Sequence, residues 1–160
     1  MAQDLLIDLS NLDLGSVVLD QEGIRALIRQ RYEMEQLNAI LWFDRELRLL
    51  VGRKDVRSDE FWVRGHIPGR PLFPGALMIE AAAQLSSVGY RLFSPEEDAR
   101  FVGFGGVDDV KFRRAIAPPA TLLLLGKCVE LRNRRVIFLT QGVEDGKLAF
   151  SATIVGMPIV

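Results

Sequence analysis

The residues that could carry out acid–base chemistry are few, and they gather in one stretch of the sequence. His66 is the only histidine among the 160 residues, so any proton transfer through an imidazole must use it. Imidazole is mostly neutral at cellular pH and can therefore accept a proton. Glu80 follows in an apolar run, where a carboxylate loses hydration and must either protonate more readily or find a partner. A base and an acid in different environments are what the elimination of water across a carbon–carbon bond requires.

Two further residues could complete such a site. Gly75 directly precedes the apolar run, and the first N–H groups of a helix have no partner within it and lie at the positive end of its dipole. Such a donor could stabilise a developing enolate oxygen, and the missing Cβ would let a thioester approach closely. The same dipole favours the anionic form of Glu80 by about 0.3 to 1 kcal/mol, which deep burial would outweigh. Gln84 could hydrogen-bond either Glu80 or a loop carbonyl.

Each of these residues also has an ordinary structural explanation. A lone histidine is more often a structural residue than a catalyst, and a segment rich in proline and glycine is more often a rigid loop than an active site. Spacing alone therefore favours a structural role for His66 and Gly75. For Glu80 the two explanations are balanced, because buried unpaired glutamates are rare.

The two elements that must position these residues are well defined. Residues 61–75 read FWVRGHIPGRPLFPG, and the three prolines exclude a regular helix or a central strand. Residues 76 to about 93 contain no proline and are rich in Ala, Leu, Met and Ile, which predicts a buried helix. An acidic loop at residues 96–98 should follow it. The helix has one polar stripe, formed by Glu80, Gln84 and Ser87.

The sequence also predicts the elements before and after this loop and helix. Residues 1–20 indicate a loosely docked arm, and helical spacing predicts a surface helix from residue 21 to about 37 with Asp20 as its N-cap. Residues 39–56 should form two strands around Asp44, Arg45 and the turn signal at Gly52. Four more strands, joined by hairpins at residues 131–134 and 144–146, should form an antiparallel meander: 100–112, 121–131, 135–142 and 147–155. The pattern predicts an α+β fold in which an antiparallel sheet curls around one long helix.

Composition excludes several other classes of protein. The net charge of −1 provides no overall field for a polyanion, so we expect no nucleic acid partner. A single cysteine excludes an intrachain disulfide, and no cluster of His and Cys is spaced for zinc. No apolar run approaches the roughly 18 residues of a membrane span. We expect one cytoplasmic domain over residues 1–160, with an arm and surface helix over 1–38 and the core over 39–160, and neither metal nor cofactor.

A resemblance to a known family sharpens this interpretation. Residues 65–84, GHIPGRPLFPGALMIEAAAQ, resemble the signature GHFPxxPxxPGVLxxEAxAQ of the 3-hydroxyacyl-[acyl-carrier-protein] dehydratases. Residues 54–62 and 101–117 resemble strands of the same family, so the similarity covers about residues 40–157. The resemblance implies a hotdog fold, in which the sheet wraps around one long central helix. It also implies that two chains pair edge to edge, with each active site at their interface.

The resemblance assigns a role to each residue of the motif. It implies that His66 removes the C2 proton of a 3-hydroxyacyl thioester and that Glu80 of the partner chain helps the 3-hydroxyl group leave as water. Gly75 would donate its amide to the thioester oxygen, and Gln84 would support the acid. Related dehydratase-isomerases carry Asp at the position of Glu80, so the glutamate indicates plain dehydration to a trans-2-enoyl product.

Two segments depart from the family pattern. Residues 29–34, RQRYEM, stand where the family commonly has Pro-His-Arg-Tyr-Pro-Phe, and residues 118–120, PPA, replace Pro-Gly-Asp. Neither change touches the proposed acid, base or amide donor. They bear instead on acyl chain length and carrier docking. They also keep open a noncatalytic hotdog module that binds acyl chains or acts as a scaffold, and thioester hydrolysis on the same fold is a third possibility.

The implied partner is an acyl carrier protein bearing a 3-hydroxyacyl phosphopantetheine, in fatty acid biosynthesis. The implied assembly is a homodimer or a trimer of dimers. Four apolar residues could line an acyl tunnel or simply belong to the core: Leu72, Phe73, Met78 and Ile79. Five basic residues could steer an acidic carrier or form a solvated face: Arg64, Arg70, Lys111, Arg113 and Arg114.

Overall fold

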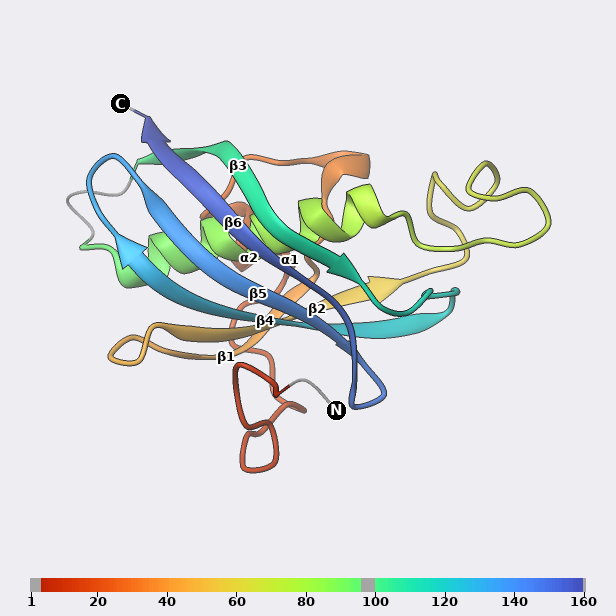
Figure 1. Ribbon diagram of the computed structural model, residues 1–160, viewed down its shortest axis with the longest axis horizontal. Coiled ribbons are helices and arrows are strands. Elements are labelled where there is room, and N and C mark those ends of the chain that lie inside the picture. Colours follow the sequence, from red (N-terminus) through yellow and green to blue (C-terminus); the bar gives the residue numbers. More distant parts are fainter. Residues whose placement is uncertain (1–3, 96–99, 160) are drawn as a thin grey trace.

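A computed structural model describes residues 4–95 and 100–159 and shows one long helix packed against a six-stranded antiparallel sheet (Figure 1). The acidic loop expected at residues 96–98 lies outside the described residues. The helical elements are α1 (Gln21–Arg25), the 3₁₀ turn η1 (Tyr32–Met34) and α2 (Gly75–Phe93). The strands are β1 (Ala39–Asp44), β2 (Leu49–Val56), β3 (Phe101–Phe112), β4 (Ala120–Leu131), β5 (Val136–Glu144) and β6 (Lys147–Ile159). The α+β class is confirmed.

Helix α2 forms where the sequence predicts it and lies across one face of the curved sheet (Figure 1). It begins directly after Pro74, whose backbone is extended, and it ends at Phe93, two residues before Pro95. Its apolar residues face the sheet, and Ala81, Leu85 and Val88 are fully buried. The expectation of a buried helix is confirmed.

The strand order is β1-β2-β4-β5-β6-β3, with every neighbouring pair antiparallel. Strands β4, β5 and β6 form the expected meander through two hairpins. The predicted meander also places the strand over residues 100–112 beside the next strand, and this part of the prediction is wrong. Strand β3 pairs with β6 at the outer edge of the sheet. The segment that joins β3 to β4 contains two prolines and forms backbone hydrogen bonds with other parts of the chain. Arg113 N donates to Ala149 O at 2.7 Å, and Ile116 O accepts from Phe73 N at 2.8 Å.

Asp44 and Arg45 lie at the turn between the two strands as predicted, but the turn signal assigned to Gly52 is wrong. The chain turns between β1 and β2, at residues 45–48, and Gly52 lies inside β2 opposite Ile40. A Cβ atom on Gly52 would lie 2.8 Å from side-chain atoms of both Leu37 and Leu85. The glycine is therefore needed where α2 approaches the sheet closely, not for a turn.

The predicted helix over residues 21–37 is much shorter than expected. Asp20 caps α1 as predicted, accepting from Gly23 N at 2.9 Å, but the helix ends at Arg25. The guanidinium group of Arg31 donates to the carbonyls of Arg25, Ile28 and Gln30, which gives this part of the chain partners outside a helical ladder. Tyr32 then takes a positive φ of 58°, which a continuing helix does not permit.

The N-terminal arm is docked more firmly than predicted. Ile7 is buried, and it packs with Val51, Leu125 and Val143. Because side chains alternate along a strand and Leu124 belongs to the core around α2, Leu125 and the arm lie on the opposite face of the sheet. Gln141 binds the arm through both polar atoms of its side-chain amide: its Oε1 accepts from Leu6 N at 2.7 Å and its Nε2 donates to Asp4 O at 3.1 Å. None of the described helices is long and apolar enough to cross a membrane.

Candidate active site

The loop of residues 57–74, which joins β2 to α2 and carries His66, projects beyond the end of the sheet (Figure 1). Its first turn is fixed by a buried ion pair between Lys54, whose side chain is 2% exposed, and Glu60, at 8%. The second oxygen of Glu60 accepts from Arg57 N at 2.8 Å. The ammonium group of Lys54 also lies 5.4 Å from the centre of the Phe73 ring. One buried cation therefore contacts residues near both ends of the loop.

Apolar packing and backbone bonds hold the rest of the loop. The buried rings of Trp62 and Phe73 meet edge to face, with their centres 5.4 Å apart. His66 N donates to Trp62 O at 2.8 Å and Leu72 N donates to His66 O at 2.9 Å, so the loop folds back on itself around the histidine. An irregular segment with this many internal contacts can hold a side chain in one position.

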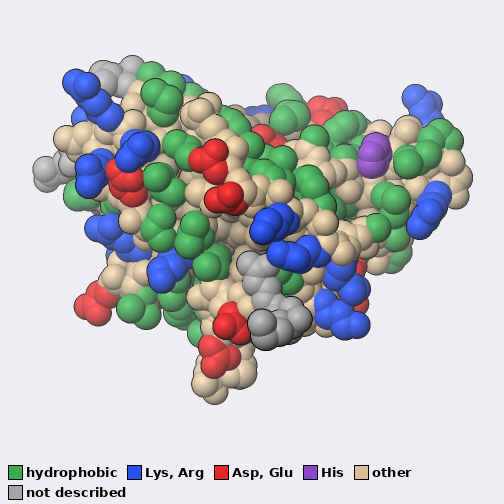
Figure 2. All heavy atoms as spheres, viewed as in Figure 1, with side chains coloured by type: hydrophobic (Ala, Val, Ile, Leu, Met, Phe, Trp, Pro, Cys, Tyr) green, Lys and Arg blue, Asp and Glu red, His purple; other side chains and the backbone are tan. Residues whose placement is uncertain are grey.

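The imidazole of His66 lies on the exposed surface of this loop (Figure 2). Its Nδ1 atom is 2.8 Å from the carbonyl oxygen of Leu72. A carbonyl oxygen can only accept a hydrogen bond, so the neutral ring carries its proton on Nδ1. This tautomer leaves Nε2 with a free lone pair, as a general base requires.

Glu80 and Gln84 are joined on α2, and Gln84 binds both groups that the sequence left as alternatives. Its Nε2 donates to Glu80 Oε1 at 2.9 Å and to Met34 O at 2.6 Å. Its Oε1 accepts from Gln36 N at 2.9 Å. Because Gln84 is buried, these bonds fix one oxygen of the half-buried Glu80 carboxyl group and leave the other available.

Gly75 is the first residue of α2, so its N–H is among those that a helix leaves without an internal partner. Its position also has a packing requirement. A Cβ atom there would lie 2.9 Å from Cζ of Phe112, which is closer than carbon atoms normally approach. The glycine therefore allows the end of β3 to pack against the start of the helix.

Glu80 lines a cavity of about 190 Å³ between α2 and strands β3, β5 and β6, called here the Glu80 cavity. Its walls are mainly apolar and include Val102, Phe104, Val136 and Phe138. These strand residues were not identified from the sequence, because each belongs to an ordinary apolar alternation. Of the four predicted acyl-binding residues, Phe73 and Met78 are buried in the core, and Leu72 and Ile79 are half-buried.

No hydrogen bond or ion pair joins His66 to Glu80 within the described part of one chain. The histidine lies on the projecting loop, and the glutamate lies beside the Glu80 cavity on α2. The structure thus brings Glu80 together with Gln84, and Gly75 together with Phe112, but it does not connect the predicted base with the predicted acid in a single copy.

The five predicted docking residues are all exposed, and they form two groups. Arg64 and Arg70 lie on the projecting loop that also carries the histidine. Lys111, Arg113 and Arg114 lie at and just after the end of β3. Arg114 pairs with Glu144 at 3.7 Å.

Other chemistries find little support in the described residues. Burial raises the pKa of the Cys128 thiol to about 11, so this cysteine is not a ready nucleophile at neutral pH. Within residues 4–95 and 100–159, no group of three or more His, Cys, Asp or Glu side chains is placed to hold a metal ion.

An antiparallel sheet wrapped around one long helix is the hotdog fold, and solved structures confirm it. The dehydratase heterocomplex ApeI:P from Xenorhabdus doucetiae matches 86% of this chain and 91% of its own, with a TM-score of 0.72 and 13% sequence identity. A mutant form of the thioesterase PA1618 from Pseudomonas aeruginosa matches 83% of this chain and 99% of its own, with a TM-score of 0.60 and 18% identity. At these identities the likeness shows the fold alone.

Sequence comparison identifies the family. Residues 28–153 match the FabA-like domain. The 3-hydroxyacyl-[acyl-carrier-protein] dehydratase FabZ of Moorella thermoacetica is 35% identical over 116 residues, which are 72% of this chain and 80% of the relative. The FabZ dehydratase of Streptococcus pneumoniae is 31% identical over 137 residues, 86% of this chain and 96% of the relative. The chain therefore belongs to the FabA-like family, and the resemblance drawn from residues 65–84 is confirmed.

Proposed function

We propose that this protein dehydrates a 3-hydroxyacyl thioester, carried by an acyl carrier protein, to the trans-2-enoyl thioester. Its relatives bear the name of this activity, and its fold is that of a known dehydratase complex. The observation that carries the proposal is the bond from His66 Nδ1 to Leu72 O, which leaves Nε2 as a base on a rigid loop. We expect the protein to act in fatty acid biosynthesis in the cytoplasm.

The residues can perform the elimination without a cofactor. Nε2 of His66 removes the C2 proton, and the electron pair of that C–H bond becomes the double bond between C2 and C3. The C3–O bond breaks as Glu80 donates a proton to the hydroxyl group, which leaves as water. The amide of Gly75 stabilises the negative charge that develops on the thioester oxygen. Proton transfer from His66 back to Glu80 restores the starting state.

The site would be completed by a second copy of the chain. His66 is exposed and is not joined to Glu80 of its own chain, so a base shielded from water requires another surface to cover it. Strand β3 lies at the edge of the sheet and exposes Phe101, Phe104 and Phe112. We infer that two copies pair along β3, so that Glu80 of one faces His66 of the other. Such dimers could assemble further into trimers of dimers.

The direct test follows the absorbance of the enoyl thioester with purified protein and a series of 3-hydroxyacyl thioesters. General acid–base groups contribute about 10² to 10⁴ each, so His66→Ala and Glu80→Gln should lower kcat by those factors while the melting temperature stays unchanged. Arg134→Gln, on an exposed hairpin, is the matched control. Normal turnover in both catalytic variants would contradict the proposal.

The same assay separates the two alternatives. A thioesterase would release free thiol, which a colorimetric reagent detects, and it would produce no enoyl absorbance. A noncatalytic acyl-binding module would bind the thioester without consuming it.

Carrier docking through the exposed basic residues has its own test. Arg64 and Arg70 lie beside His66, and an acidic carrier attracted to them would bind more slowly as salt screens the charges. Turnover of carrier-linked substrate should therefore fall with salt much more than turnover of a short thioester analogue. An equal fall in turnover with salt for the two substrates would contradict docking by these charges.

A further inference from the structure

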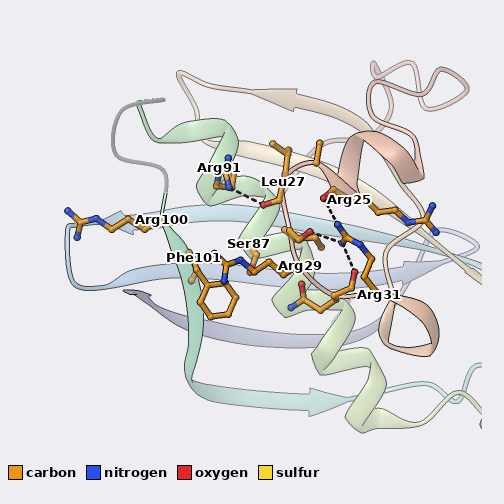
Figure 3. A pocket seen from close by; sticks show the side chains of 12 residues that line it. Arg25, Leu27, Arg29, Arg31, Ser87, Arg91, Arg100 and Phe101 are labelled. Carbon is orange, nitrogen blue, oxygen red and sulfur yellow. Dashed lines mark hydrogen bonds between the residues drawn. The ribbon is translucent and has the colours of Figure 1, made fainter. Parts of the chain in front are cut away.

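A second pocket, distinct from the Glu80 cavity, is lined by an unusual number of arginines. It has a volume of about 230 Å³ and lies between residues 25–31, the second half of α2 and the start of β3 (Figure 3). None of its described lining residues is acidic. We call it the arginine pocket, after Arg25, Arg29, Arg31, Arg91 and Arg100.

Most of this positive charge has no carboxylate partner among the described residues. Arg25 is the exception, because it pairs with Glu22 and with Glu35, the latter at 2.8 Å. The remaining arginines form no ion pair among the described residues and contact neutral groups, although the charge of Arg31 helps to lower the pKa of the Glu35 carboxyl group. Arg31 donates to three carbonyls, Arg91 donates to Leu27 O at 3.3 Å, and Arg100 donates to Asn133 O at 3.5 Å.

Arg29 is the least restrained of the set. Its guanidinium group lies over the ring of Phe101, 4.9 Å from the ring centre, and its side chain is exposed. Stacking on a ring leaves the N–H groups in the plane of the guanidinium free to bind an anion. A carboxylate suits this surface because a guanidinium group can donate two parallel bonds to it.

The arginine pocket adjoins the Glu80 cavity, because both are lined by Gln30, Ser87, Phe101 and Val102. Ser87 follows Glu80 by seven residues on α2, or about 10 Å along the helix axis. An acyl chain that begins beside Glu80 and follows the apolar walls of the cavity would therefore reach the arginines with its far end. A methyl end group would gain nothing there, whereas a negatively charged one would be bound.

We propose that the arginine pocket binds a carboxylate at the far end of the acyl chain. This rests on the proposed dehydratase function and names its substrate class: 3-hydroxyacyl thioesters whose ω-carbon carries a carboxylate. Because the end group is bound alike in substrate and transition state, the arginines should lower KM and leave kcat unchanged.

The test compares 3-hydroxyacyl pantetheine thioesters of equal chain length that end in a methyl group or in a carboxylate. Charge-assisted hydrogen bonds predict a roughly ten- to hundredfold higher kcat/KM for the carboxylate, at the best chain length. Arg29→Met should remove most of this preference by raising KM for the carboxylate substrate alone. Arg91→Met should act in the same direction, and Arg134→Gln should leave the preference intact. A methyl-ended substrate that reacts equally well or better would overturn the proposal while leaving dehydration in place.

Two further measurements separate other outcomes. The phosphate of phosphopantetheine is another source of negative charge, so methyl-ended pantetheine and phosphopantetheine thioesters are compared in the same variants. If Arg29→Met lowers only the higher kcat/KM of the phosphopantetheine thioester, the pocket binds the phosphate of the carrier arm and the proposal is wrong. If no substrate reacts, the methyl-ended and carboxylate-ended thioesters stay intact and their binding can be measured by calorimetric titration. The carboxylate-ended thioester should then bind at least about tenfold more tightly. Equal affinities would overturn the proposal.

Discussion

Two irregular segments flank the central helix, and they are held by different forces. The loop of residues 57–74 is anchored by the buried Lys54–Glu60 pair and by the packed rings of Trp62 and Phe73. Residues 26–36 are held mainly by hydrogen bonds that are exposed or only partly buried, from Arg31 to backbone carbonyls and from Arg25 to Glu35. The first segment carries the proposed base, and the second carries two of the five arginines of the arginine pocket, Arg29 and Arg31.

The different anchoring of the two segments matches the different functions proposed for them. A general base must be held within a fraction of an ångström of its target, which requires anchors that do not exchange with water. A pocket for the end of a chain can tolerate small movements. The departure from the family pattern at residues 29–34 falls in the less deeply anchored segment. Breaking an anchor should therefore cost far more stability in the loop than in residues 26–36.

The largest effect on stability is expected for Lys54→Met. It leaves the Glu60 carboxylate buried without its cation, which costs about 3 to 5 kcal/mol. Urea unfolding should show this loss, and turnover should fall because the loop around His66 loosens. The double variant Lys54→Met with Glu60→Gln removes the buried charge and should recover much of the stability. A single variant within about 1 kcal/mol of the natural protein would show that the pair is not an anchor.

The elements that could be predicted from the sequence are those fixed by local chemistry. Helix α2 follows from a proline-free apolar run after Pro74, and the β5–β6 hairpin follows from its Asp-Gly turn. The position of β3 depends on pairing with β6, which no local pattern specifies. Glycine is common in turns, yet Gly52 is required by close packing against Leu37 and Leu85. The short α1 reflects competition by the Arg31 side chain for backbone carbonyls.

The candidate site divides in the same way. His66, Gly75, Glu80 and Gln84 share one continuous motif, so the sequence identifies them together. The walls of the Glu80 cavity and the arginine pocket come from segments that meet only in the folded chain. The bonds of Gln84 to Met34 O and Gln36 N are of this second kind, and they connect α2 to the segment that bears Arg29 and Arg31.

Gly75→Ala should have an intermediate effect on stability, and it tests the packing role of this glycine. The added methyl group would lie 2.9 Å from Phe112 Cζ, and overpacking of this kind costs about 1 to 3 kcal/mol. Phe112→Leu in the same chain should relieve the contact and restore the melting temperature. Failure of Phe112→Leu to rescue Gly75→Ala would show that packing against this ring is not what requires the glycine.

The smallest effect is expected for Glu35→Gln, in the second segment. Hydrogen bonds from Arg25 hold the pKa of the Glu35 carboxyl group below its ordinary value of 4.5. A lowered pKa in the folded state means that the unfolded chain binds the proton more tightly, so this group stabilises the fold above pH 4.5 and ceases to do so as pH falls through the lowered value. At pH 7 the substitution should cost about 1 kcal/mol, or a few degrees in melting temperature.

The gap between the natural protein and Glu35→Gln should then close on acidification below pH 4.5, when melting temperatures are compared across a pH series. A gap that stays constant, or that widens in acid, would show that the Arg25–Glu35 pair does not stabilise residues 26–36. Because the substitution also removes one of the two carboxylate partners of Arg25, it should strengthen binding of carboxylate-ended acyl thioesters at pH 7 if the arginine pocket holds their end group. The same variant thus weakens the less deeply anchored segment slightly while sharpening its proposed ligand preference, which no substitution at Lys54 should do.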